Sequence, residues 1–130
     1  MDTSTARSTD HRRSLGATGE QIAADHLVRR GYAILDRNFR TRAGELDIVA
    51  ANDRAIVFCE VKTVYADTSR EPLDAIDARK RAKVRRMAAE WLAAHVGARP
   101  RVAELRFDAV GITLARDLTL VQLDHLEAAF

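Results

Sequence analysis

Two apolar segments in the middle of the chain constrain the fold most strongly. Both Glu45–Ala51 and Ala55–Thr63 have the composition of β-strands, and the turn-forming sequence Asn52-Asp53-Arg54 separates them, which predicts a hairpin. The second segment is apolar at almost every position, as is typical of a central strand covered on both faces. Glu60 and Lys62 interrupt this strand. A charge inside such a strand is costly without a partner, so both residues are candidates for a function.

The N-terminal part of the chain changes character at about Leu15. Residues 1–14 are rich in Ser, Thr and Arg and lack an apolar period, which predicts a mobile tail outside the core. From about Leu15 to Arg30 the pattern is helical, and Glu20, Ala24 and Leu27 share one face. A carboxylate therefore lies on the stripe that is predicted to be buried.

The rest of the chain predicts one further long helix and several strands. The helix is predicted from about Leu73 to His95, and Lys80 is the basic member of its apolar stripe, which also contains Leu73, Ile76, Val84, Met87 and Trp91. The other expected elements are strands at Ala33–Phe39, Val102–Leu114 and Leu118–Leu123, and a short helix or tail at Asp124–Phe130. Residues 15–130 are therefore expected to form a single α/β domain, with a mixed central sheet flanked by the two helices.

The overall composition excludes several classes of protein. The chain has 130 residues, of which 47% are hydrophobic and 31% charged, which suits one globular domain. No apolar stretch approaches the roughly 20 residues that span a bilayer, and the N-terminus has no apolar signal core. Cys59 is the single cysteine, so an intrachain disulfide is excluded. We therefore expect a cytoplasmic protein that does not bind membranes.

Charge is unevenly distributed although the net charge is only +2. Six of the eight residues from Arg79 to Arg86 are basic, whereas acids gather between Gly44 and Glu60. One surface could then attract phosphates while acidic groups bind a cation. Lys80, Lys83 and Arg86 are three residues apart, so they could follow a nucleic-acid strand; the alternative is that the lysine stems only cover the core.

Four charged residues in the hairpin form the most informative group. Side chains alternate along a strand, so Glu45 and Asp47 project to one side, as do Glu60 and Lys62 on the neighbouring strand. Mg²⁺, or Mn²⁺ in its place, prefers oxygen ligands, and Asp47, Glu60 and the backbone carbonyl of Val61 would suffice as the protein's share. Lys62 could orient an attacking water or stabilise charge on a phosphodiester.

Several short motifs carry a resemblance to a known family. They are Gly19-Glu20, Gly31-Tyr32, Asn38-x-Arg40, Gly44-Glu45-Leu46-Asp47-Ile48-Val49, Phe58-Cys59-Glu60-Val61-Lys62, Lys80 with Lys83, and Arg106-Phe107-Asp108. With these motifs the chain resembles the YraN family of small bacterial proteins from about Leu15 to Leu123. The resemblance implies a restriction-endonuclease-like fold with a PD-(D/E)xK site, distantly similar to archaeal Holliday-junction resolvases. It also implies that Asp47 is the first acid, Glu60 and Lys62 form the E-x-K pair, and Glu20 is the helical acid.

The preferred interpretation is a metal-dependent nuclease that hydrolyses DNA phosphodiester bonds, with Asp47, Glu60, Lys62 and Glu20 as its catalytic group. Glu45 is an additional candidate ligand, and Arg40 joins the basic helix as a candidate contact with nucleic acid. Whether the protein forms a homodimer stays open. Two alternatives remain: a nucleic-acid-binding module of the same fold without catalysis, and an adaptor protein whose acidic cluster is incidental.

Each candidate residue also has a purely structural interpretation. Asp47 and Glu60 could form ion pairs with Lys62 or Arg54, Glu20 could be an N-terminal helix acid, and Glu45 could face solvent. Other charged, sulfur-containing and imidazole side chains are expected to have structural roles only. Arg106 and Asp108 are expected to form a local ion pair, Cys59 is expected to pack on the face opposite Glu60, and the histidines show no paired metal spacing.

Overall fold

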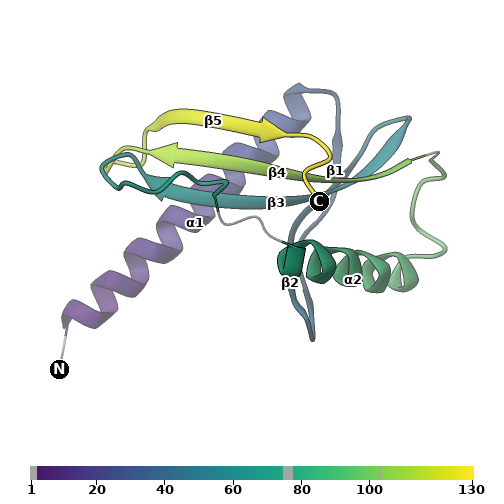
Figure 1. The fold of residues 1–130 in the computed structure, drawn as a ribbon, viewed down its shortest axis with the longest axis horizontal. Coiled ribbons are helices and arrows are strands. Elements are labelled where there is room, and N and C mark those ends of the chain that lie inside the picture. The colour runs from purple at the N-terminus through teal and green to yellow at the C-terminus, as the bar shows by residue number, and fades with distance from the viewer. Residues whose placement is uncertain (1–2, 75–77, 103) are drawn as a thin grey trace.

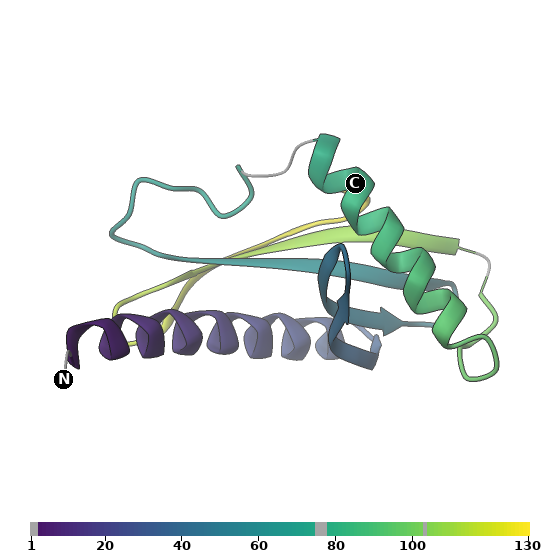
Figure 2. The same ribbon diagram turned by 90° about the horizontal axis from the view of Figure 1, so that it is seen from below.

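The computed structural model describes residues 3–74, 78–102 and 104–130, and within them five strands form one sheet in the order β1-β2-β3-β4-β5. Helix α1 (Thr3–Arg29) lies on one face of the sheet and helix α2 (Ala78–Ala94) on the other, as Figures 1 and 2 show. The strands are β1 (Ala33–Thr41), β2 (Gly44–Ala51), β3 (Ala55–Tyr65), β4 (Glu104–Leu114) and β5 (Leu120–Leu126).

The sheet is mixed because one of its four strand pairs is parallel. Strands β3 and β4 pair in parallel along their whole length, from Ala55 opposite Glu104 to Tyr65 opposite Leu114, whereas the other three pairs are antiparallel. A parallel pair needs a long crossover connection, and the segment that contains α2 supplies it. The predicted α/β class, with a mixed central sheet flanked by two helices, is confirmed.

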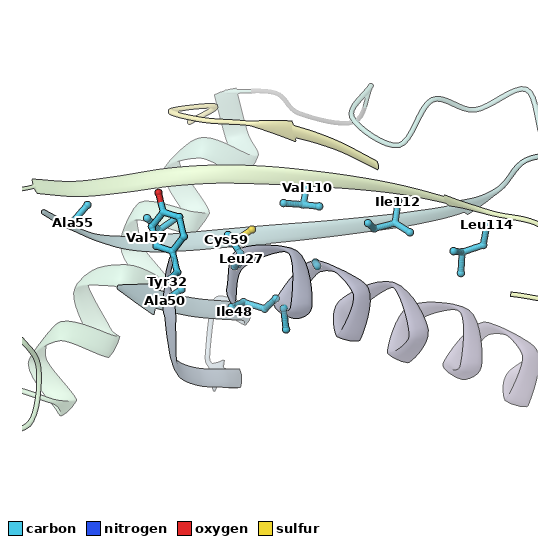
Figure 3. Close-up of a cluster of buried hydrophobic side chains, with 12 residues drawn as sticks. Leu27, Tyr32, Ile48, Ala50, Ala55, Val57, Cys59, Val110, Ile112 and Leu114 are labelled. Atoms are coloured by element: carbon cyan, nitrogen blue, oxygen red, sulfur yellow. The ribbon is translucent and has the colours of Figure 1, made fainter. Parts of the chain in front are cut away.

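The central strand β3 contributes to a hydrophobic core on each face of the sheet. Its odd-numbered residues, including Val57 and Cys59, pack with Leu27 of α1 in the cluster of Figure 3. Its even-numbered residues Ile56 and Phe58 pack under α2, where Trp91 meets the Phe58 ring edge-on. Burial on both sides explains the nearly unbroken apolar run of the sequence. It also follows that Glu60 projects toward α2.

Two predicted boundaries differ from the structure. Helix α1 begins at Thr3 rather than at about Leu15, because extending an existing helix adds a hydrogen bond per residue without a new nucleation cost. The proposed division into a tail and a domain stays a prediction. Helix α2 begins at Ala78, and Leu73 belongs to a turn; Ile76 lies outside the described residues. Within the described residues, no helix combines the length and apolarity that crossing a membrane requires.

The prediction of a short C-terminal helix or tail from Asp124 is wrong in its first half. Asp124, His125 and Leu126 belong to β5, where Asp124 pairs with Gly111 of β4. Pairing with β4 satisfies the backbone groups of this segment and buries part of one face, and such tertiary context overrides local preference.

Close contact between α1 and β3 depends on Gly19. A Cβ atom at this position would lie 1.9 Å from Thr63 Oγ1 and 2.8 Å from Thr63 Cβ, so only glycine fits without a shift. Glu20 follows directly, and its position over the sheet therefore depends on this approach of the helix.

We predict that Gly19→Ala destabilises the protein by about 1–3 kcal/mol, because the new methyl group overpacks the helix against β3. Gly16→Ala is the matched control, because apart from its chain neighbours and its own helix backbone no described residue lies within 4 Å of its Cβ position. That variant should be neutral or more stable by up to about 1 kcal/mol, since alanine favours the helix. Urea unfolding followed by circular dichroism measures both. Equal stability of the two variants would show that α1 and β3 are not in close contact at Gly19.

Candidate metal centre

The candidate site begins where β2 separates from β3. The ladder between these strands ends at the pair Ile48–Cys59. Asp47 Oδ2 then accepts a hydrogen bond from the backbone N–H of Val61 at 2.7 Å. A carboxylate side chain thus supplies an acceptor at the fork between two strands, and Asp47 is held there.

Three carboxylates meet at this fork. One oxygen each from Glu20, Glu45 and Asp47 lies within 4.8 Å of the others. Glu45 and Asp47 project together from β2, as strand alternation predicted, and Glu20 reaches them from α1. Glu20, which the sequence placed on the buried stripe of its helix, thus lies close to Asp47, but it is not among the residues that line the described cleft beside it. An acidic group of this kind suits a hard divalent cation.

Asn38 of β1 connects two of these acids. In the amide orientation that satisfies its neighbours, Asn38 Nδ2 donates to Glu45 Oε1 at 2.5 Å and to Glu20 Oε2 at 3.2 Å. Its backbone has a φ of 54°, a left-handed conformation that asparagine tolerates better than most residues. From the sequence, Asn38 is named only as part of the Asn38-x-Arg40 motif and has no predicted role in the site, although asparagine is unfavourable inside a strand.

Glu60 projects from β3 into the same region on the α2 side. Its Oε1 lies 3.2 Å from Lys80 Nζ, and only 18% of its side chain is exposed. Its Oε2 is buried and has no hydrogen-bond partner within the described part of the chain. A buried carboxylate oxygen without a partner is costly, and a bound cation would satisfy it. The donor set therefore fits a divalent metal.

The electrostatics of the acids at the fork also favour a bound divalent cation. Burial raises the pKa of Asp47 to about 7, and repulsion from Glu60 adds to this effect, while the hydrogen bond from Val61 opposes it. Burial also raises the pKa of Glu20, with Glu45 adding to the shift and Arg37 opposing it. Without a cation, the site therefore destabilises its own ionised carboxylates.

The acids open into a cleft of about 480 Å³ between the sheet and α2. Glu45, Asp47 and Glu60 line the side of the sheet, and α2 contributes Arg79, Lys80, Lys83, Val84 and Met87. Gly44 makes room for the helix, because a Cβ there would lie 2.9 Å from Lys83 Cε. Acidic and basic groups therefore face each other across the cleft.

The other predicted site residues lie outside this described lining. Lys62 is exposed on β3, and Arg86 is exposed on α2. Arg40 is exposed on β1, where it is in register with Glu45. Glu60 does form an ion pair, as its alternative interpretation expected, but the partner is Lys80 rather than Lys62 or Arg54.

A second polar group connects α1, β4 and β5. Asp108, which is fully buried, accepts hydrogen bonds from Arg106 Nε at 2.9 Å and His125 Nε2 at 2.8 Å, so the predicted Arg106–Asp108 ion pair is confirmed. His125 Nδ1 lies 2.9 Å from His26 Nε2, a contact that sequence spacing did not suggest. Cys59 is buried on the face opposite Glu60, as predicted. This network fastens β5 to the core.

The fold and the cleft together define an α/β protein with a candidate divalent-metal centre at the fork of its sheet. Comparison with known sequences identifies the family. Residues 19–112 match the sequence profile described as "Uncharacterised protein family UPF0102", and the chain belongs to this family. The resemblance to the YraN family is confirmed at this level.

Similar proteins from several organisms share the UPF0102 name. A UPF0102 protein of Frankia alni is 44% identical over 117 residues, covering 90% of this chain and 94% of that protein. One from Mycobacterium avium is 41% identical over 129 residues and 98% of both chains. One from Geobacter metallireducens is 40% identical over 120 residues, covering 92% of this chain and 94% of that protein. These names state a family and no activity.

We predict that Asp47→Asn stabilises the metal-free protein at pH 8 but not at pH 4. The pKa of Asp47 is about 7 in the folded state against an ordinary value of 3.8. Folding stability therefore falls as the pH rises between these values, because only the unfolded state releases the proton readily. Asparagine removes this loss, which is at most about 4 kcal/mol for roughly three pKa units.

Urea unfolding at both pH values, in the presence of a chelator, measures this difference. Asp53→Asn, in the exposed turn between β2 and β3, is the matched control and should change stability little at either pH. If Asp47→Asn also leaves stability unchanged at pH 8, then Asp47 is not a buried and repelled carboxylate.

Proposed function

We propose that this protein is a metal-dependent nuclease that hydrolyses DNA phosphodiester bonds with Mg²⁺ or Mn²⁺. The observation that carries the proposal is the buried Oε2 of Glu60, which has no hydrogen-bond partner among the described residues and lies beside the cluster of Glu20, Glu45 and Asp47. Oxygen ligands of this kind suit these two ions. The basic wall of α2 across the cleft supplies positive charge for a phosphate backbone.

Asp47 and Glu60 would hold the ion, with the backbone carbonyl of Val61 as a third ligand; Glu45 is a further candidate ligand, and Glu20 would act beside them. When bound, such an ion polarises the phosphate and lowers the pKa of a water. The hydrogen bond from Val61 N–H keeps the Asp47 carboxylate in place. Lys62, two residues beyond Glu60, would approach the nucleophile from its exposed position on β3.

The arrangement of the acids supports a restriction-endonuclease-like fold as the origin of the site. In this arrangement a hairpin presents one acid from β2 and an E-x-K pair from β3, next to an acid from the first helix. We propose on this basis that the family belongs to the PD-(D/E)xK superfamily and is distantly related to archaeal resolvases. A cytoplasmic location, a DNA partner and a homodimer stay parts of this proposal.

A catalytically silent nucleic-acid-binding module is the second candidate. Two observations favour it: Lys62 is exposed outside the described lining of the cleft, and Lys80 is paired with Glu60. A silent module would keep the metal and the DNA affinity but lack cleavage. The two candidates therefore differ in product formation and in nothing that a binding assay measures.

We predict that Asp47→Asn, Glu60→Gln and Lys62→Ala each reduce DNA cleavage by about 100-fold or more, since each removes stabilisation of the transition state. The assay uses labelled linear, flapped and four-way DNA with and without Mn²⁺, and circular dichroism checks folding. Asp53→Asn is the control with unchanged activity. Cleavage by Asp47→Asn at the wild-type rate would refute the site, and DNA binding by wild type without cleavage would establish the silent module.

We predict that replacing Lys83 and Arg86 together with alanine weakens DNA binding similarly for all sequences. The dependence of affinity on salt should fall by about one unit of slope per lost phosphate contact, because fewer counterions are released. Arg29→Ala with Arg30→Ala removes the same charge from exposed positions at the end of α1 and serves as control. Equal effects of the two double variants would show that α2 is not the DNA-binding surface.

A further inference from the structure

The side chain of Lys80 lies on the face of α2 that packs against the sheet, unlike the exposed basic side chains of this helix. It lies on the stripe that also contains Val84, Met87 and Trp91, all of which are buried against the sheet. Only 27% of its side chain is exposed, whereas Arg79, Lys83 and Arg86 are exposed. The packing of the helix thus directs the ammonium group of Lys80 toward the acids, where it contacts Glu60.

That ammonium group contacts a proposed metal ligand. Lys80 Nζ lies 3.2 Å from Glu60 Oε1, and Glu60 Oε2 is the buried oxygen for which the described part of the chain offers no hydrogen-bond partner. A divalent cation held by Glu60 and Asp47 would place two further positive charges next to the ammonium. Like charges a few Å apart repel strongly where solvent screens them only in part. Lys80 and a metal ion therefore cannot both interact with Glu60 at full strength.

We propose that Lys80 is an internal competitor of the metal ion, which holds Glu60 when the site is empty and turns to a phosphate of the nucleic acid when the ion binds. The inference rests on the proposed metal site. A lysine suits this exchange, because its ammonium is a compact charge on a flexible four-carbon stem. Its Cα stays fixed on the packed helix while the charged end moves.

The exchange couples two binding events. An ion that displaces Lys80 from Glu60 makes a cation available to the phosphate backbone, so the metal increases the affinity for nucleic acid. By linkage, nucleic acid must then increase the affinity for the metal by the same factor. Lys83 lines the same cleft and carries the same charge, but lies over Gly44 at the tip of the β1–β2 hairpin. It is therefore the matched control for the general effect of losing a positive charge.

The test measures Mn²⁺ binding alone, by the electron paramagnetic resonance signal of the free ion, for wild type, Lys80→Gln and Lys83→Gln. Lys80→Gln should bind Mn²⁺ about tenfold more tightly than wild type, because the competing unit charge is gone, and Lys83→Gln should change the affinity much less. Lys80→Arg should remain close to wild type. If Lys80→Gln does not fold, Lys80→Met removes the charge and keeps the apolar stem.

The outcomes separate the inference from the proposed function. Equal Mn²⁺ affinities for Lys80→Gln and Lys83→Gln would overturn the inference while the metal site stands. Absence of Mn²⁺ binding in wild type and in every variant would overturn the metal site, and the inference with it. Tighter binding confined to Lys80→Gln supports the inference. In that case Ca²⁺ should also tighten the binding of a short DNA duplex to wild type more than to Lys80→Gln.

Discussion

The hydrogen bond from Val61 N–H to the Asp47 carboxylate is the interaction on which the site depends. It occurs where the ladder between β2 and β3 ends. The Asp47 side chain therefore supplies the acceptor for Val61 N–H that the backbone of β2 does not supply there. Because β2 separates there, Glu45 has room beside Asp47, and Glu20 can reach both from α1. A ladder continued past Ile48 would leave less space for three carboxylates. The fork in the sheet and the acidic cluster are therefore one feature.

The cluster is destabilising by itself, and the surrounding structure has to offset that cost. Burial and mutual repulsion raise the pKa values of Asp47 and Glu20. Asn38, whose backbone is in the left-handed conformation, donates its amide to Glu20 and Glu45. Two hydrophobic cores, one on each face of β3, supply the compensating stability. Concentrated strain of this kind is common where a protein binds ligands.

The sequence predicts the sheet better than the site. The apolar run of β3 and the turn at Asn52 define the hairpin, and strand alternation places Glu45 beside Asp47, because these are local patterns with a fixed period. No local pattern shows where a ladder ends, so the fork at Asp47 could not be predicted. The ion-pair partner of Glu60 could not be identified from the sequence either, and the alternative interpretation named Lys62 or Arg54. Lys62 is near in sequence, but Lys80 arrives from a helix whose position only tertiary packing determines.

Helix α2 connects stability with the chemistry of the cleft. Val84 and Met87 belong to the core under the helix and also line the cleft, so the wall of the cleft cannot shift without disturbing that core. Lys80 and Lys83 project from this fixed wall on flexible stems. The rigid helix backbone holds both lysines near the acids. Their flexible stems let the ammonium groups adjust to an irregular polyanion. This combination explains why one amphipathic helix can close the core and face the carboxylates at the same time.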